Sequence, residues 1–200
     1  MGQPMISLTN VSFSYRGAES PSLSSLSLDV KAGECVLLCG KSGCGKSTVL
    51  RLLNGMIPEF FDGDLTGRVR VGDMDPTTCP QYKVARQVGT VFQNPRTQFY
   101  TLDTTSEVAF GCENRGMPRA EISRRVNEAA ADLGIAALMN RNIFHLSGGE
   151  KQRVAIASVY ATGPEVLLLD EPSANLDFPA IRELRRTLDI LRSKGKTILI

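Results

Sequence analysis

The stretch Gly40-Lys41-Ser42-Gly43-Cys44-Gly45-Lys46-Ser47 decides the fold of this chain. It matches the phosphate-binding loop Gly-x-x-x-x-Gly-Lys-Ser/Thr at every fixed position. A short apolar run, Val36-Leu37-Leu38-Cys39, precedes the loop, and Val49, Leu50 and Leu53 follow it at helical spacing. A strand, a glycine loop and a helix in this order are the context that a phosphate-binding loop requires, so a chance glycine-rich turn is disfavoured.

The loop contains the groups that hold a nucleoside triphosphate. The backbone N–H groups of residues 40–47 are expected to point at the β-phosphate, and the positive end of the following helix adds to the attraction. Lys46 is predicted to neutralise the β- and γ-phosphates, and the hydroxyl of Ser47 is predicted to bind Mg²⁺. Cys44 is either an inert filler at a variable position or a thiol made reactive by the helix N-terminus.

An acidic pair follows the second apolar run, Val166-Leu167-Leu168-Leu169. At this strand end Asp170 can reach Mg²⁺ directly or through water, and Glu171 lies on the alternate side, toward an attacking water. Such a pair is often only a turn or a helix cap. The phosphate-binding loop in the same chain favours a role in phosphoryl transfer.

The stretch Leu146-Ser147-Gly148-Gly149-Glu150-Lys151-Gln152-Arg153 lies about a hundred residues after the loop. Ser147 and Glu150 have the spacing of a capping box, which opens a helix. A helix N-terminus is an anion site, and glycines let a phosphate approach the backbone closely. Because the chain already has one complete phosphate-binding loop, this second site is predicted to serve another nucleotide. An ordinary capping box is the simpler alternative.

The rest of the chain alternates between strand and helix patterns. Residues 6–30 alternate apolar and polar side chains around a loop at 17–25, which predicts antiparallel strands with one face in water. Residues 62–80 predict loops and short strands, and 94–117 give no clear pattern. Further strands are predicted at 36–39, 88–92, 166–169 and 197–200, and helices at 47–54, 118–134, 147–163 and 180–193. Buried strands alternating with helices indicate a parallel α/β sheet, and Cys35 and Cys39 are expected to be buried in it.

Together, the phosphate-binding loop, the acidic pair and the glycine stretch resemble the ATPase domain of ABC (ATP-binding cassette) proteins over the whole chain. The resemblance implies an α/β P-loop NTPase fold with a RecA-like core, an N-terminal antiparallel β-subdomain and an inserted helical subdomain. The core and β-subdomain are expected in 1–93 and 152–200, and the helical subdomain in 94–151. It also implies that two such domains pair head to tail, so that the glycine stretch of one closes over the γ-phosphate held by the other. Glu171 then acts on the attacking water.

Three further positions match the ABC pattern. The resemblance implies that Tyr15 stacks on adenine, that Gln93 contacts Mg²⁺ and the water, and that Asp177, in Ser173-Ala174-Asn175-Leu176-Asp177, touches the opposite domain. The bland alternatives are a packed tyrosine, a loop glutamine and a helix N-cap. The predicted catalytic residues are Glu171, Gln93 and Lys46, and the predicted Mg²⁺ ligands are Ser47, Gln93 and Asp170. The predicted ATP-binding residues are Tyr15, Gly40, Lys41, Ser42, Gly43, Cys44, Gly45, Lys46, Ser47, Thr48, Ser147, Gly148, Gly149 and Asp177.

One stretch is more specific. Val91-Phe92-Gln93-Asn94-Pro95, with Gln98-Phe99 and residues 107–114, is similar to the energy-coupling factor (ECF) ATPases, which drive uptake of vitamins and of cobalt or nickel ions. That similarity implies a membrane transporter subunit as partner and a place at the cytoplasmic face of the membrane. Phe99 and Tyr100 are then either contacts with that subunit or core residues.

Composition limits the alternatives. The net charge of +2 over 200 residues gives no reason to expect a nucleic-acid partner, and neither a signal peptide nor a membrane span is visible. A soluble ABC ATPase that acts on DNA or ribosomes is one alternative, and a nucleotide-binding module without hydrolysis is another. The histidine that ABC domains carry after the strand beginning at Thr197 is not found before Ile200. We therefore expect a truncated domain with weak or no hydrolysis by itself.

Overall fold

The computed structural model describes residues 3–174 and 176–200. Met1, Gly2 and Asn175, the last within the predicted domain-contact stretch, lie outside the described residues. The chain forms two compact units. The first comprises Met1–Val88, Glu165–Leu168 and Gly195–Ile200, and the second comprises Gly89–Pro164 and Leu169–Lys194.

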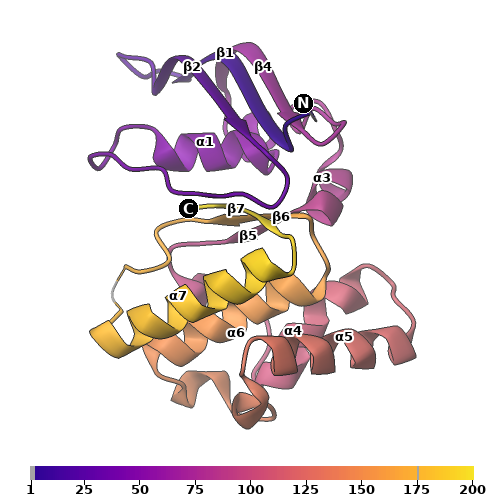
Figure 1. Ribbon diagram of the computed structural model, residues 1–200. Helices are drawn as coiled ribbons and strands as arrows, with labels where there is room; N and C mark the ends of the chain where they lie inside the picture. The colour runs from indigo at the N-terminus through magenta and orange to yellow at the C-terminus, as the bar shows by residue number, and fades with distance from the viewer. Residues whose placement is uncertain (1–2, 175) are drawn as a thin grey trace. The chain divides into compact units, whose positions relative to one another are not determined.

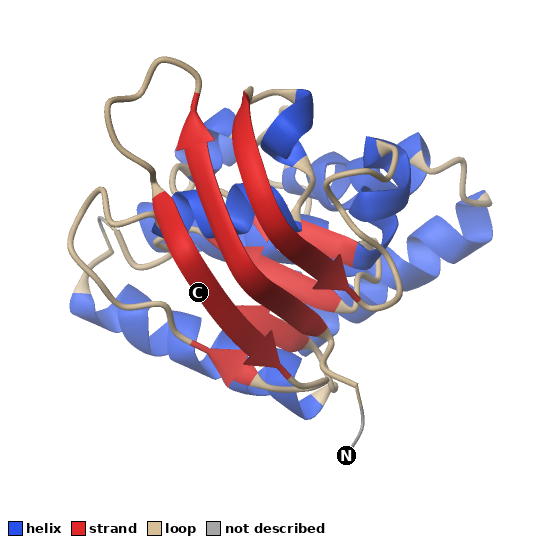
Figure 2. Cartoon of the chain, turned by 90° about the horizontal axis from the view of Figure 1, so that it is seen from above, coloured by secondary structure: helices blue, strands red, loops and turns tan. Residues whose placement is uncertain are grey.

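The first unit begins with an antiparallel sheet, seen face-on in Figure 2. Its strands β1 (Ile6–Tyr15), β2 (Leu23–Val30) and β4 (Gly63–Val71) lie in the order β2-β1-β4. The predicted antiparallel pairing within residues 6–30 is confirmed. The prediction of loops and short strands at 62–80 is confirmed for the turns at 72–80 but is wrong for 63–71, which form one nine-residue strand paired with β1. The two glycines of β4 had concealed that strand, since glycine is poor in strand propensity.

The helices of the first unit are α1 (Lys46–Leu53), α2 (Met56–Glu59) and α3 (Gln81–Gln87). Helix α1 confirms the helix predicted after the glycine loop, and it runs beneath the antiparallel sheet (Figure 1). Its apolar side chains join the inward-facing side chains of β1 in one buried cluster. The loop before α1 is therefore anchored to the hydrophobic core of this unit.

The second sheet has the strand order β3-β7-β6-β5, with β3 (Cys35–Val36), β5 (Val88–Val91), β6 (Val166–Leu169) and β7 (Thr197–Leu199). The predicted parallel pairing is confirmed for β3 with β7 and for β6 with β7. The prediction of a buried strand at 36–39 is wrong. Strand β3 is two residues long and ends the sheet, Leu37 is 63% exposed, and Cys35 and Cys39 are exposed. An edge strand has only one strand neighbour, so its open edge and the residues that continue from it are in contact with water.

The second unit is helical. It contains α4 (Thr104–Asn114), α5 (Arg119–Asp132), α6 (Gly148–Ala161) and α7 (Phe178–Ser193), with 3₁₀ turns at Pro95–Thr97, Ala136–Leu138 and Ile143–His145. Helix α6 contacts α4, α5 and α7, and it lies among them in Figure 1. The helices predicted at 118–134, 147–163 and 180–193 are confirmed. Within the described residues, no helix is both long and apolar enough to span a bilayer.

Candidate functional site

The glycine loop bends sharply at Gly45, the residue that caps α1. Gly45 has φ +96°, in the left-handed region that favours glycine. A Cβ at this position would lie 2.6 Å from the carbonyl oxygen of Ser22 and 2.7 Å from Cδ2 of Leu23. Both the backbone angle and the space therefore require glycine here. The N-terminus of α1, the positive end of the helix dipole, opens directly from this bend.

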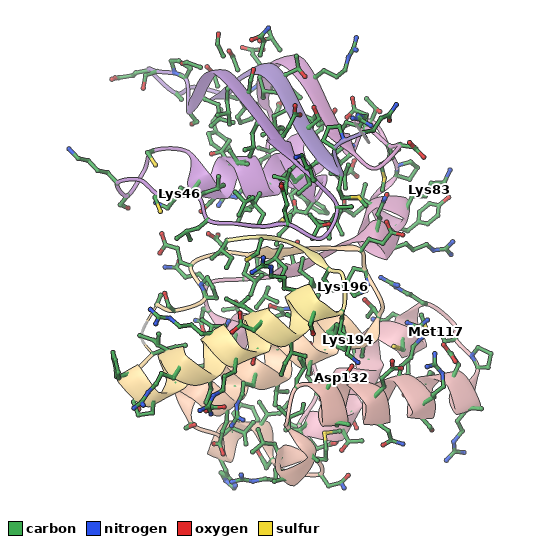
Figure 3. The ribbon with its side chains drawn as sticks, viewed as in Figure 1. Lys46, Lys83, Met117, Asp132, Lys194 and Lys196 are labelled. Atoms are coloured by element: carbon green, nitrogen blue, oxygen red, sulfur yellow. The ribbon has the colours of Figure 1, made fainter. Side chains whose placement is uncertain are left out.

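The side chain of Lys46 folds back over the loop. Its Nζ donates to the carbonyl oxygens of Gly40 at 3.0 Å and Lys41 at 3.1 Å. The ammonium group is thus held beside the loop backbone, where it is close to the N–H groups at the start of α1. Figure 3 labels Lys46 at this end of α1. A helix N-terminus with a cation beside it fits the oxygens of a polyphosphate.

Tyr15, at the end of β1, reaches the same helix. Its hydroxyl lies 3.1 Å from Oγ1 of Thr48, in the first turn of α1, and accepts a hydrogen bond from Nη1 of Arg51 at 2.8 Å. The structure therefore places the predicted adenine-stacking residue against the helix that carries the phosphate-binding loop. Its stacking on adenine stays a prediction. Arg51 was not predicted from the sequence, where it is the single basic residue of the predicted helix at 47–54, which is otherwise mostly apolar.

In the second unit, two predicted catalytic residues meet. Nε2 of Gln93 donates to Oε2 of Glu171 at 2.8 Å, although 78 residues separate them in sequence. The backbone N–H of Asp170 donates to the carbonyl oxygen of Val91 at 2.9 Å, which brings the two chain segments together. Glu171 has φ +44°, an unfavourable backbone angle for this residue type. Strained backbone of this kind is concentrated at functional sites.

The predicted capping box is present at the start of α6. The Glu150 carboxylate accepts from the backbone N–H of Ser147 at 2.8 Å, and the Ser147 hydroxyl accepts from the backbone N–H of Glu150 at 3.3 Å. The bond from the Ser147 backbone is the main reason that the pKa of Glu150 is lowered, and Arg141 adds to the effect. The carboxylate is therefore charged at neutral pH, and the helix N-terminus is held in place.

The two glycines of this stretch differ in their surroundings. A Cβ at Gly148 would meet no atom within 4 Å, whereas a Cβ at Gly149 would lie 2.7 Å from Cβ of Ala180 in α7. Gly148 thus presents open backbone, and Gly149 permits the close packing of α6 on α7. The sequence predicted one role, access for a phosphate, for both residues.

A pocket of about 390 Å³ in the second unit brings Gln93 and Gly148 together. Gln152 also lines it; this side chain is 3% exposed, and its Nε2 has no hydrogen-bond partner among the described residues. The other residues that line this pocket are Asn94, Pro95, Arg96, Lys151, Ala174 and Leu176. The segment at Gln93 and the start of α6, which are far apart in the sequence, therefore border one pocket. Gln152 was missed, although a polar residue in the buried run of α6 was a visible signal.

Comparison with known proteins decides the family. The ABC transporter family matches residues 23–174, which include the glycine loop, the capping box and the acidic pair. The chain belongs to the ABC transporter family. The predicted family and the α/β P-loop fold are confirmed, and ATP-binding domains of ABC transporters hydrolyse ATP.

The relatives of this ABC domain are longer proteins. A Treponema denticola protein, whose name places it among ABC transporter ATP-binding proteins, is 49% identical over 196 residues, which cover 98% of this chain and 40% of that protein. A Streptomyces coelicolor relative with the same kind of name is 43% identical over 197 residues, which cover 98% of this chain and 35% of that protein. The ABC domain described here therefore spans 40% or less of the length of these relatives.

A solved structure is also similar to this ABC domain. It is cbiO1 from Clostridium perfringens, described as part of the ABC transporter complex cbiONQ. The TM-score is 0.88 and the sequence identity 31%, and the alignment covers 100% of this chain and 78% of cbiO1. The likeness therefore extends over both compact units.

Asp177 and the three predicted Mg²⁺ ligands are the remaining predicted residues of the site. Asp177 is the N-cap of α7, where its side chain accepts from the backbone N–H of Ala180 at 2.9 Å. The N-cap role is the simpler alternative to a contact with a second domain, and one residue can have both roles. The predicted Mg²⁺ ligands Ser47, Gln93 and Asp170 supply hydroxyl, amide and carboxylate oxygens, which suit a hard cation.

Proposed function

We propose that this ABC domain hydrolyses ATP as a subunit or cassette of an ECF-type importer that takes up a vitamin, cobalt or nickel. The observation that carries the hydrolytic part is the hydrogen bond between Gln93 and Glu171, which orients the carboxylate proposed to act on the attacking water. The ECF-like stretch 91–114 and the likeness to cbiO1 support the importer. The proposed place of the domain is the cytoplasmic face of the membrane.

The loop residues and the acidic pair divide the chemistry of hydrolysis. Lys46 and the N–H groups of the loop bind the triphosphate and stabilise charge on its oxygens. Glu171, held by Gln93, polarises the attacking water in line with the bond that breaks. Mg²⁺, held by Ser47, Gln93 and Asp170, would neutralise charge on the phosphates. Catalysis is then positioning and charge stabilisation, without a covalent intermediate.

A second domain is proposed to complete the site. Ser147 and Gly148 present a capped helix N-terminus with open backbone, and this chain's own loop already holds one triphosphate. We therefore assign the exposed N-terminus of α6 to the γ-phosphate of a nucleotide bound by a partner ABC domain, in head-to-tail pairing. The partner is an identical copy, a paralogue or a second cassette of the same protein.

The contact with the membrane subunit is proposed at an exposed apolar patch of the second unit, formed by Tyr100, Leu102 and Phe144. These side chains are 74%, 68% and 70% exposed. Tyr100 stacks on Phe110 with ring centroids 5.0 Å apart, so its ring is held in an exposed position. A pocket of about 280 Å³ between Phe99, Ile143 and Phe144 adjoins the patch. Exposed apolar side chains beside a pocket are typical of a surface that binds another protein.

The test is association with a purified ECF transmembrane subunit in lipid nanodiscs, measured by co-purification. The unaltered protein should bind, and Tyr100→Ser with Phe144→Ser should weaken binding by at least about tenfold, the loss expected for buried aromatic anchors. Tyr82→Ser is the matched control, because Tyr82 is also an exposed tyrosine, at 61%, and lies in the first unit. Equal binding by both variants contradicts the patch. Tight, salt-sensitive binding to DNA or ribosomes instead contradicts the importer.

A further inference from the structure

We propose that Arg51 is a positioning residue for the nucleotide base: it holds Tyr15 in place and joins the base-binding end of the site to the phosphate-binding end. The inference rests on the proposed nucleotide site at residues 40–48. It adds a residue outside the phosphate-binding loop, and it predicts a difference between ligands that carry a base and ligands that do not.

The geometry is a chain of polar contacts on one face of α1. Thr48 and Arg51 are three residues apart on the helix, so their side chains lie on the same face. Between them lies the Tyr15 hydroxyl, 3.1 Å from Oγ1 of Thr48 and 2.8 Å from Nη1 of Arg51. Thr48 is 5% exposed, so this end of the chain of contacts is shielded from water. The hydroxyl is thereby fixed from two sides by the helix that carries the loop.

Aromatic contacts fix the Tyr15 ring as well. Phe13 and Phe61 both make edge-to-face contacts with it, at centroid distances of 4.8 Å and 6.3 Å. The guanidinium of Arg51 lies over the Phe61 ring, with Cζ 4.3 Å from its centroid. Arg51 therefore holds both aromatic neighbours, Tyr15 by a hydrogen bond and Phe61 by a cation–π contact.

This double contact suits arginine and not lysine. A planar guanidinium can lie against a ring and donate a directed hydrogen bond at the same time, whereas an ammonium group is a strongly hydrated point charge. Packing alone does not need the Tyr15 hydroxyl, because a phenylalanine ring would fill the same space. The hydroxyl instead ties the orientation of the ring to the first turn of α1, where the phosphates are proposed to bind.

The experiment compares two ligands of the purified protein by calorimetry, Mg-ATP and inorganic tripolyphosphate with Mg²⁺. Tripolyphosphate has no base, so it reports on the loop alone. Arg51→Ala should raise the Kd for ATP about tenfold, less than the full value of a base–aromatic stack. It should change the Kd for tripolyphosphate by less than about twofold. Arg51→Lys should give a smaller loss, of about threefold for ATP.

A double-mutant cycle assigns the effect to Tyr15. If Arg51 acts through the Tyr15 hydroxyl, Tyr15→Phe and Arg51→Ala should lose less together than the sum of their separate losses in ATP affinity. Arg86→Ala is the matched control, because Arg86 also lies over a ring, with Cζ 6.0 Å from the centroid of Tyr82. That control should leave both ligands unaffected.

The outcomes separate this inference from the proposed function. Equal weakening of both ligands by Arg51→Ala, or full additivity with Tyr15→Phe, overturns the positioning role. An ATP affinity that Arg51→Ala leaves unchanged also overturns the positioning role. If the unaltered protein binds neither ligand, the proposed nucleotide site itself fails. Should Arg51→Ala not fold, the same comparison is made with Arg51→Lys and Tyr15→Phe, for which a loss specific to ATP is again required.

Discussion

Gln93 and Glu171 share a hydrogen bond of 2.8 Å, from Nε2 to Oε2. The glutamine follows β5 and the glutamate follows β6, so each side chain projects from the end of a strand in the parallel sheet. Glu171 keeps its position at φ +44°, which a glutamate adopts only when its surroundings hold it there. The hydrogen bond thus orients the carboxylate, and an oriented group is the condition for efficient positioning of a water.

The first prediction concerns this carboxylate. Glu171→Gln should lower the rate of ATP hydrolysis by about 10² to 10³-fold, as expected for the loss of a general base. The Kd for ATP should change little, because the phosphates are held by the loop. Phosphate release and calorimetry measure the two quantities. Glu183→Gln is the control, since Glu183 is a half-buried glutamate of the second unit, on α7, paired with Arg186.

Glu171→Gln also tests head-to-tail pairing. If ATP closes two domains and hydrolysis opens them, the variant should keep a doubled mass in Mg-ATP, as measured by light scattering. The Glu183→Gln control should return to its starting mass when ATP is consumed. Hydrolysis by Glu171→Gln within a few-fold of the unaltered rate would show that the carboxylate is not the base.

The second prediction separates the two glycines at the start of α6. Gly149→Ala should lower the free energy of unfolding by about 1–3 kcal/mol, because the new methyl group overlaps Ala180 in α7. Gly148→Ala should change it by less than about 0.5 kcal/mol, since no atom lies within 4 Å of the added carbon. Gly148→Ala should nevertheless reduce hydrolysis several-fold, because the methyl group stands between the backbone and a phosphate of the partner domain.

Chemical denaturation and phosphate release give both readouts. The double variant Gly149→Ala with Ala180→Gly restores the space between α6 and α7 and should recover part of the lost stability. If Gly148→Ala leaves hydrolysis unchanged while Gly149→Ala abolishes it at full stability, the assignment of the two roles is reversed.

The third prediction concerns pH. Asp132 accepts hydrogen bonds from Nζ of Lys194 and from the hydroxyl of Tyr160, each at 2.8 Å. The pKa of this carboxyl is lowered from its ordinary value of 3.8, chiefly by the hydrogen bond from Lys194 and to a smaller extent by the one from Tyr160. Because the folded pKa is the lower one, the stabilisation is complete above pH 3.8 and is lost as the pH falls through the folded pKa.

Asp132→Asn should therefore destabilise the protein by about 1–2 kcal/mol at neutral pH, the size of hydrogen bonds to a charged group. The difference between the two proteins should shrink as the pH falls below 3.8. Urea denaturation across this pH range measures it. A difference that stays constant with pH would mean that the charge of Asp132 contributes nothing to stability.

Parts of this fold follow from local rules. The bend at Gly45, the capping box of Ser147 and Glu150, and the apolar run of β6 each depend on residues close together in the sequence. Such features were predicted with nearly the right bounds. The likeness to ABC proteins implied that Gln93 and Glu171 both act on the attacking water. Their direct hydrogen bond became visible only in the structure.

Other parts depend on partners far along the chain. Helix α4 was not predicted, because its buried residues include the polar Thr104 and Glu107, so apolar periodicity is weak. Burial of Glu107 becomes favourable only because its carboxylate accepts hydrogen bonds from the backbone of Tyr100 and Thr101. The exposure of Leu37 and the contact of Arg51 with Tyr15 likewise depend on which segments meet in space.

The contacts of Asp132 bear on how the second unit moves. Asp132 ends α5, Tyr160 lies near the end of α6, and Lys194 follows α7, so one carboxylate ties the ends of three helices. Helix α6 has 14 residues, a length of about 21 Å at 1.5 Å per residue. Gly148 is at its opposite end. If a partner's nucleotide displaced Gly148, α6 would tilt as a stiff rod with its other end fixed by Asp132.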